Sequence, residues 1–180
     1  VPDGLSNLPV SLRRRLQVTQ QCRAEDIDAV RAAYASHDIP AELATYLPDL
    51  PQRLGWAHMV ISRAGASTIA ELTCAGRPAI LVPLPSATDD HQSANVQEMV
   101  EAGGACALAQ SDFTPDRLAQ AIDQIGLSEE KLMDAAGRAR GIGRPNATGD
   151  LADLVEALDR PTAPQMVGVS KEFKLAGAGA

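Results

Sequence analysis

The sequence predicts an α/β fold in which helices cover a parallel sheet. Short apolar runs alternate with longer helical patterns along most of the chain, as such folds require. Glycine or proline follows several of the apolar runs and marks sharp turns from strand to helix. The hydrophobic content of 45% suits one soluble lobe, and no apolar run approaches the roughly 18 residues that a membrane-spanning helix needs.

Five strands are expected, near residues 16–19, 42–46, 58–62, 79–82 and 105–109. Helices are expected between them, near 24–37, 50–56, 67–75 and 91–102. Two further helices open at capping residues, in the runs Thr114-Pro115-Asp116 and Ser128-Glu129-Glu130. The pattern is that of strand, helix and strand in regular alternation, followed by a helical end.

A last helix carries an apolar stripe of Leu151, Leu154, Val155 and Leu158. Core packing is the simplest interpretation, and the alternative is a partly exposed stripe that promotes self-association. From Pro161 to Ala180 the composition shifts to Pro, Gly, Ala and Lys without a sustained period, which predicts a disordered tail.

The junction after residue 61 is the first candidate site. The apolar run 59–61 predicts a buried strand, Gly65 permits a sharp turn, and Ser67 or Thr68 is expected to cap a helix that ends at Gly76. Free N–H groups and the helix dipole favour an anion at such a helix start, and Gly65 and Ala66 carry no side chain that blocks a close approach.

Glu71 lies one turn into this helix, on the same side as Thr68. A carboxylate there would accept two hydrogen bonds from a ribose diol, as the acidic residue of dinucleotide folds does. The alternative is that Thr68 and Glu71 form only a capping box, which satisfies helix amides and binds nothing.

The junction after the apolar run 80–82 is the second candidate site. Pro83 and Pro85 end the run, and His91, Gln92 and Asn95 then open a helix. The amides of Gln92 and Asn95 share a helix face, and an amide can donate to and accept from sugar hydroxyls or phosphate oxygens. Asp89, Asp90 and His91 suggest a metal site instead, but helix capping explains the aspartates and no second cluster of ligands is present in the sequence.

Three sequence runs resemble the MurG family of peptidoglycan glycosyltransferases. They are RAGASTIAEL at 63–72, GRPAILVPLP at 76–85 and DHQSAN at 90–95. The resemblance also includes QQC at 20–22, VRAAY at 30–34 and EAGGA at 101–105, and it covers about residues 1–158. It implies the C-terminal, donor-binding lobe of a two-lobed GT-B fold over residues 1–158, followed by a tail over 159–180.

The resemblance also implies how the donor, UDP-N-acetylglucosamine, is bound. The backbone of Leu47 would meet the uracil edge, although Pro48 replaces a residue that is often acidic in the family. The helix start would meet the diphosphate, Glu71 the ribose hydroxyls, and Gln92, with His91 or Asn95, the sugar. The implied donor-binding set is Leu47, Ala66, Ser67, Thr68, Ile69, Ala70, Glu71, His91, Gln92 and Asn95, with no catalytic residue, metal or cofactor.

In this family the reaction transfers N-acetylglucosamine from UDP-N-acetylglucosamine to lipid I and forms lipid II. It is carried out as an inverting transfer by a peripheral enzyme on the cytoplasmic face of the bacterial inner membrane. The family's first strand, its glycine-rich loop and the acceptor lobe are not found in this sequence, so the chain alone is expected to be inactive. Two alternatives stay open: a non-catalytic UDP-sugar-binding subunit of a two-chain glycosyltransferase, and a UDP-sugar epimerase relative.

Charge and composition argue against other classes of protein. A net charge of −7 and an aromatic content of 3% are unfavourable for binding nucleic acid. The basic run Arg13-Arg14-Arg15 is interpreted as a solvated helix face, with anionic lipid headgroups as the alternative partner. Cys22, Cys74 and Cys106 are widely spaced, so buried, reduced thiols of a cytoplasmic protein are expected.

Overall fold

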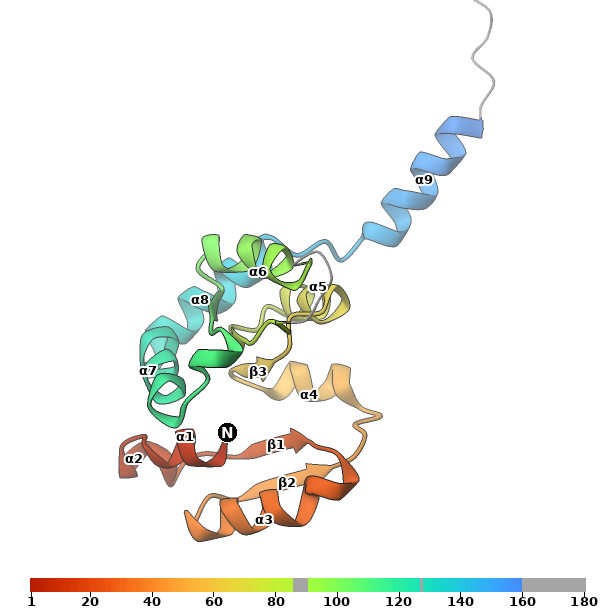
Figure 1. Ribbon diagram of the computed structural model, residues 1–180. Helices are drawn as coiled ribbons and strands as arrows, with labels where there is room; N and C mark the ends of the chain where they lie inside the picture. Colours follow the sequence, from red (N-terminus) through yellow and green to blue (C-terminus); the bar gives the residue numbers. More distant parts are fainter. Residues whose placement is uncertain (86–90, 127, 160–180) are drawn as a thin grey trace, which may run out of the picture. The chain divides into compact units, whose positions relative to one another are not determined.

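The computed structural model describes residues 1–85, 91–126 and 128–159, and its elements alternate as the sequence predicts (Figure 1). The strands are β1 (Val18–Gln21), β2 (Ala41–Ala44), β3 (Val60–Ser62), β4 (Ala79–Leu81) and β5 (Ala105–Ala107). The helices are α1 (Pro2–Ser6), α2 (Val10–Arg13), α3 (Ile27–Ser36), α4 (Leu50–Trp56), α5 (Ala66–Ala75), α6 (His91–Glu101), α7 (Pro115–Gly126), α8 (Glu129–Gly141) and α9 (Ala147–Asp159). Short 3-10 helices occupy Ala24–Asp26 and Gln110–Asp112.

All of the strand pairings are parallel, but the described strands form two sheets. β1 pairs with β2, and the second sheet has the order β3-β4-β5. The described strands β1 and β3 share no pairing, so the two sheets are separate.

β4 lies at the centre of the buried structure. Ala79, Ile80 and Leu81 are all fully buried. Side chains alternate across a strand, so Ile80 joins one hydrophobic cluster while Ala79 and Leu81 join the other. The first cluster includes Leu5, Leu8, Tyr34, Ile39, Leu108, Leu118, Ala121 and Ile122, and the second includes Leu54, Ala64, Leu72, Val96, Met99 and Ala139. The first cluster also takes in Val18 and Leu43, so one core supports both sheets.

Several predicted helix boundaries are confirmed by their capping hydrogen bonds. The hydroxyl of Thr114 accepts from the N–H of Arg117 at 3.3 Å, and that of Ser128 accepts from the N–H of Lys131 at 3.3 Å. Gly76 ends α5 with a φ of 63°, a left-handed conformation that glycine adopts without a steric penalty. These caps fix where α5, α7 and α8 start or stop.

The chain divides into two compact units, residues 1–145 and 146–180. In the second unit, α9 exposes Leu151, Leu154, Val155 and Leu158 by 57–79%. The expectation of core packing is therefore not met, because these four side chains are exposed in the described part of the chain. The boundary predicted after residue 158 lies at the end of α9, and the tail predicted over 159–180 lies, apart from Asp159, outside the described residues.

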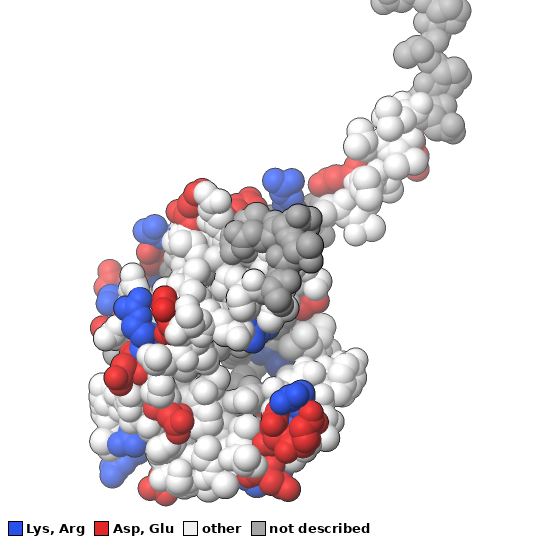
Figure 2. All heavy atoms as spheres, in the orientation of Figure 1, with Lys and Arg blue, Asp and Glu red and all other residues white. Residues whose placement is uncertain are grey.

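The cysteines are free, as predicted, but they are not all buried. Cys22 and Cys106 are partly buried, whereas Cys74 is exposed. Cys74 lies two positions after the buried Leu72, which is roughly 200° around a helix, so it points away from the core. Acidic and basic side chains are interspersed over the face shown in Figure 2, which displays no broad basic surface.

Two glycine-to-alanine substitutions should have opposite effects on stability. A Cβ at Gly104 would lie 2.8 Å from the Cα of Ala139, so α8 must shift, and we expect a loss of about 1–3 kcal/mol. A Cβ at Gly137, within α8, meets nothing within 4 Å, so Gly137→Ala should raise stability by roughly 0.5–1 kcal/mol. Urea unfolding measures both, and equal effects would contradict the close packing of α8 on the turn at Gly104.

Candidate functional site

The start of α5 presents backbone donors. Gly65 is the N-cap, in an extended conformation with φ −64° and ψ 148°, and no side chain caps the helix. The first backbone bond is from the N–H of Ile69 to the carbonyl of Gly65, at 3.0 Å. Within the described residues, the N–H groups of Ala66, Ser67 and Thr68 therefore have no hydrogen-bond partner. They point out of the positive end of the helix dipole, an arrangement that suits an anion.

This geometry corrects the prediction that Ser67 or Thr68 caps α5. The helix begins at Ala66, so both residues lie in its first turn, where their hydroxyls are past the capping position. The capping box between Thr68 and Glu71 is absent for the same reason, because such a box needs Thr68 at the N-cap. The start of α5 is thus left with donors that its own side chains do not satisfy.

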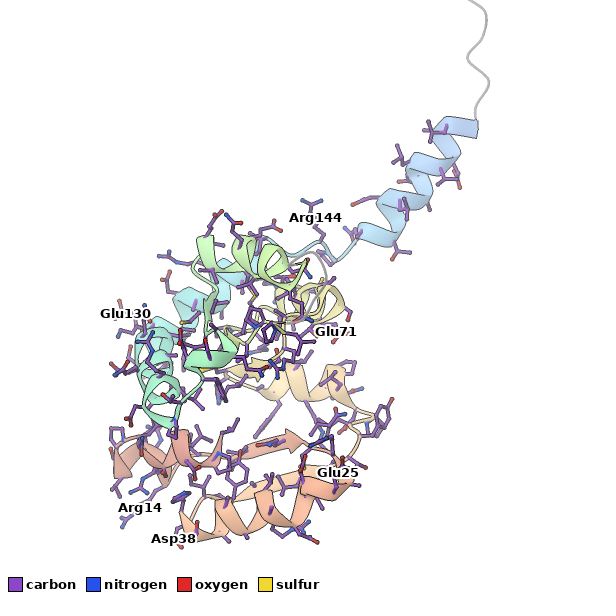
Figure 3. All side chains as sticks on the ribbon, viewed as in Figure 1. Arg14, Glu25, Asp38, Glu71, Glu130 and Arg144 are labelled. Atoms are coloured by element: carbon purple, nitrogen blue, oxygen red, sulfur yellow. The ribbon has the colours of Figure 1, made fainter. Side chains whose placement is uncertain are left out.

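The side chains of this turn divide between core and solvent. Ile69 packs against the second hydrophobic cluster and Thr68 is partly buried, while Ala66, Ser67 and Ala70 are exposed. Glu71 is exposed on α5 (Figure 3) and makes no hydrogen bond or ion pair with another described residue. Its carboxylate is free to accept hydrogen bonds from a ligand.

The start of α6 is tied to both neighbouring strand-end loops. The side-chain oxygen of Gln92 accepts from the N–H of Leu84 at 2.9 Å, and the Asn95 amide donates to the carbonyl of Ala64 at 3.4 Å. Among the described residues, the NH₂ group of Gln92 and the side-chain carbonyl of Asn95 have no further partner. The side chain of His91 and the pair Asp89-Asp90 lie outside the described residues, so the predictions on them are not tested.

Arg63 was not among the residues predicted for the site, although it is the first residue of the RAGASTIAEL run. It follows β3 directly, and its Nη1 donates to the carbonyls of Val82 and Pro83, at 3.4 and 3.5 Å. The exposed Arg63 side chain thus links the carboxyl end of β3 to that of β4, two residues before the N-cap of α5. The signal in the sequence is a cation placed directly between a strand and a glycine turn.

The loop of residues 45–49 follows β2 and carries Leu47. Leu47 is half-buried, and within the described residues neither its N–H nor its carbonyl has a hydrogen-bond partner. The side-chain amide of Gln21 donates to the carbonyl of Thr45 at 3.2 Å and holds one end of the loop. The loop leads into α4, which packs on α5.

Arg53 of α4 joins this loop to the first sheet. Its Nε donates to Asp49 at 2.8 Å, and its Nη1 and Nη2 donate to the two carboxylate oxygens of Glu42, at 2.8 and 2.7 Å. Hydrogen bonds from Arg53 lower the pKa of Glu42 and the pKa of Asp49, and both carboxylates raise the pKa of Arg53. All three groups are therefore charged at neutral pH.

The structure brings most of the predicted site together. The start of α5, the end of β4 and the start of α6 share hydrogen bonds or lie along one edge of the second sheet. The Leu47 loop is connected to them through the packing of α4 on α5, without a direct hydrogen bond in the described part of the chain. Surface hollows of about 370 and 330 Å³ lie elsewhere, beside Thr19, Glu42 and Trp56, and none of the predicted site residues lines them.

Two further observations concern metals and membranes. Within residues 1–85, 91–126 and 128–159, no three His, Cys, Asp or Glu side chains are arranged to hold a metal ion. None of the described helices combines the length and the apolarity that crossing a bilayer requires.

Parallel strands with covering helices, and backbone donors without a described partner where β3 meets α5, define a Rossmann-like lobe. The chain belongs to glycosyltransferase family 28, whose C-terminal domain matches residues 2–149.

Individual relatives support this assignment. The chain is 62% identical over 157 residues to the UDP-N-acetylglucosamine–N-acetylmuramyl-(pentapeptide) pyrophosphoryl-undecaprenol N-acetylglucosamine transferase of Novosphingobium aromaticivorans, covering 87% of this chain and 40% of that protein. The transferase of the same name from Sphingopyxis alaskensis is 52% identical over 179 residues, covering 99% of this chain and 46% of that protein. The crystal structure of Acinetobacter baumannii MurG matches with a TM-score of 0.78 at 33% identity, covering 87% of this chain and 46% of that one. The chain therefore spans less than half the length of these relatives.

Acid should weaken the fold partly through Arg53. The pKa values of Glu42 and Asp49 are lowered from 4.5 and 3.8, so their bonds stabilise the fold above those values and are lost as the pH falls through the lowered ones. We expect Arg53→Ala to be less stable than the parent at pH 7, with the difference shrinking below about pH 4. Urea unfolding across this range measures it, and a constant difference would contradict the ion pairs.

Proposed function

We propose that this chain is the donor-binding part of a glycosyltransferase that moves N-acetylglucosamine from UDP-N-acetylglucosamine to lipid I and forms lipid II. The observation that carries the proposal is that the N–H groups of Ala66, Ser67 and Thr68 have no partner among the described residues, in a turn that follows the exposed cation of Arg63 in the chain. A diphosphate matches this arrangement in charge and in its number of acceptor oxygens. Membership of the family and the names of the relatives supply the sugar and the acceptor.

Each part of the donor has a proposed partner. The diphosphate lies on the α5 start, the ribose hydroxyls on Glu71, and the uracil edge on the backbone of Leu47. The sugar meets the NH₂ group of Gln92, because the oxygen of that amide is already bonded to Leu84. His91 or Asn95 completes the sugar site.

The chemistry of transfer is divided between two lobes in this proposal. The α5 start and Arg63 stabilise the charge that develops on UDP as it leaves. The base that deprotonates the acceptor hydroxyl belongs to the acceptor lobe, so the chain alone binds donor without turning it over. The transfer is inverting and needs no metal or cofactor, and the whole enzyme acts at the cytoplasmic face of the inner membrane.

Replacing Glu71 tests the ribose assignment. Glu71→Ala should weaken UDP binding by about 10-fold or more, because a carboxylate hydrogen bond is lost. Calorimetric titration should show that 2′-deoxy-UDP binds the parent and the variant more nearly alike than UDP does. Glu98→Ala, at an exposed position of α6, is the control. Equal UDP affinity in the parent and Glu71→Ala would refute the ribose assignment.

A substitution at Gly65 should affect ligand binding without affecting folding. A Cβ there would approach only the Thr68 hydroxyl, at 3.6 Å, and the φ of −64° suits any residue, so Gly65→Ala should change stability by less than about 0.5 kcal/mol. The added methyl group would stand where the diphosphate approaches the helix start, so affinity for pyrophosphate should fall about 10-fold. Unchanged binding of pyrophosphate, measured by calorimetry, would refute the assignment of the diphosphate to this turn.

A further inference from the structure

Arg53 bridges three segments of the chain that are distant in sequence. Besides Asp49 and Glu42, its Nη1 reaches the hydroxyl of Thr19 on β1 at 3.3 Å. The side chain of Arg53 is 25% exposed, against 58% for Glu42 and 48% for Asp49, so the guanidinium is the most enclosed member of the cluster. Its bond to Asp49 is an ordinary helical pair four residues apart, whereas the bonds to Glu42 and Thr19 span 11 and 34 residues.

These bonds fasten the start and the end of one short segment to the same group. Glu42 lies in β2, just before the 45–49 loop, and Asp49 is the residue at which the loop becomes α4. Between them, Tyr46 is 72% exposed and Leu47 has no backbone hydrogen bond within the described residues. Hence the path of the loop is set mainly by its ends, which Arg53 and Gln21 hold.

The shape of the guanidinium matters as well as its charge. Arginine presents five donors in a planar fork, so it can bind both oxygens of Glu42 while its Nε turns to Asp49. A lysine ammonium is a point charge on a flexible stem and does not reproduce this fork. The bridge between β2 and the end of the loop therefore requires arginine.

We infer that Arg53 is a positioning residue that fixes the 45–49 loop, and with it the backbone of Leu47, for recognition of the pyrimidine base. The inference rests on the proposed function, in which Leu47 meets the uracil edge. It deepens that proposal because affinity for the base would depend on a side chain that does not touch the donor. Substitution of Arg53 should weaken binding of the nucleoside part of the ligand and leave binding of the diphosphate part unchanged.

The experiment compares the parent with Arg53→Ala, Arg53→Lys and a matched control, Arg138→Ala. Arg138 is suitable because its Nε also pairs with an aspartate four residues earlier, Asp134, at 2.9 Å, but on the distant α8. Amide order parameters of Tyr46 and Leu47 are measured by NMR relaxation without ligand. Calorimetric titrations with UDP and with inorganic pyrophosphate then separate base binding from phosphate binding.

In Arg53→Ala we expect the order parameter at Leu47 to fall from about 0.8 to below about 0.6, as in a flexible segment. Affinity for UDP should fall about 10-fold while that for pyrophosphate stays within about twofold. Arg53→Lys should resemble Arg53→Ala, and Arg138→Ala should match the parent. If Arg53→Ala does not fold, Arg53→Lys, which keeps the charge, gives the same comparison.

The possible failures are distinguishable. Unchanged order parameters in Arg53→Ala and Arg53→Lys would overturn the inference, whatever the ligand does. Equal losses of UDP and pyrophosphate binding would also overturn it, because they indicate a general structural effect. If the parent binds UDP no better than pyrophosphate while Arg53 still orders the loop, the proposed function fails at its uracil contact and the base-recognition part of the inference fails with it.

Discussion

The burial of β4 is the constraint on which the rest of the structure depends. Its three residues are fully buried, and their alternation sends Ile80 into one hydrophobic cluster and Ala79 and Leu81 into the other. β3 and β5 pair with it on either side, so both strands run in the same direction and end at the same edge. A polar substitution at Ile80 would disturb the first cluster and one at Leu81 the second, whereas side chains of β1 and β2 contact only the first. The donors of α5 follow β3, which takes its position from this strand.

The candidate site consists largely of backbone groups and of side chains that already have structural partners. Gln92 and Asn95 each use one polar atom to bond Leu84 and Ala64, and the other polar atom of each amide has no partner among the described residues. Arg63 likewise bonds the carbonyls of Val82 and Pro83 while remaining exposed. Such sharing orients the remaining polar atoms before a ligand arrives, which lowers the entropy lost on binding. Glu71 is the exception, because it has no described partner and must be ordered by the ligand itself.

Local sequence signals predicted the five described strands and the helices from α3 to α9, since each depends on neighbouring residues, but they missed the short helices α1 and α2. Gly76, Thr114 and Ser128 act at the helix boundaries where capping chemistry placed them. The predicted start of α5 was one residue too late, because Gly65 is followed closely by Ser67 and Thr68, which are both good capping residues. The sequence pattern alone does not choose among the three. The division into two sheets and the Arg53 cluster were not predicted, because both depend on contacts between distant segments. Arg53 meets Thr19 across 34 residues, and no periodic pattern records such a contact.

Electrostatics explains why the candidate site depends on charged and polar groups close to the ligand. The chain carries a net charge of −7, so its overall field opposes the approach of a diphosphate. Charges farther apart than about 8 Å are largely screened at physiological ionic strength, which leaves local groups to decide affinity. The helix start contributes roughly half a positive charge through fixed N–H groups that no pH change removes, and Arg63 adds a full one. Glu71 lies five residues past Ala66, about 7.5 Å along the helix axis, so its repulsion of the diphosphate is near the screening limit while its bonds to a ribose would be direct. In the proposed site, less than two turns of α5 would therefore separate the two parts of a nucleoside diphosphate, with donors at the start of the helix for the phosphates and an acceptor farther along it for the ribose.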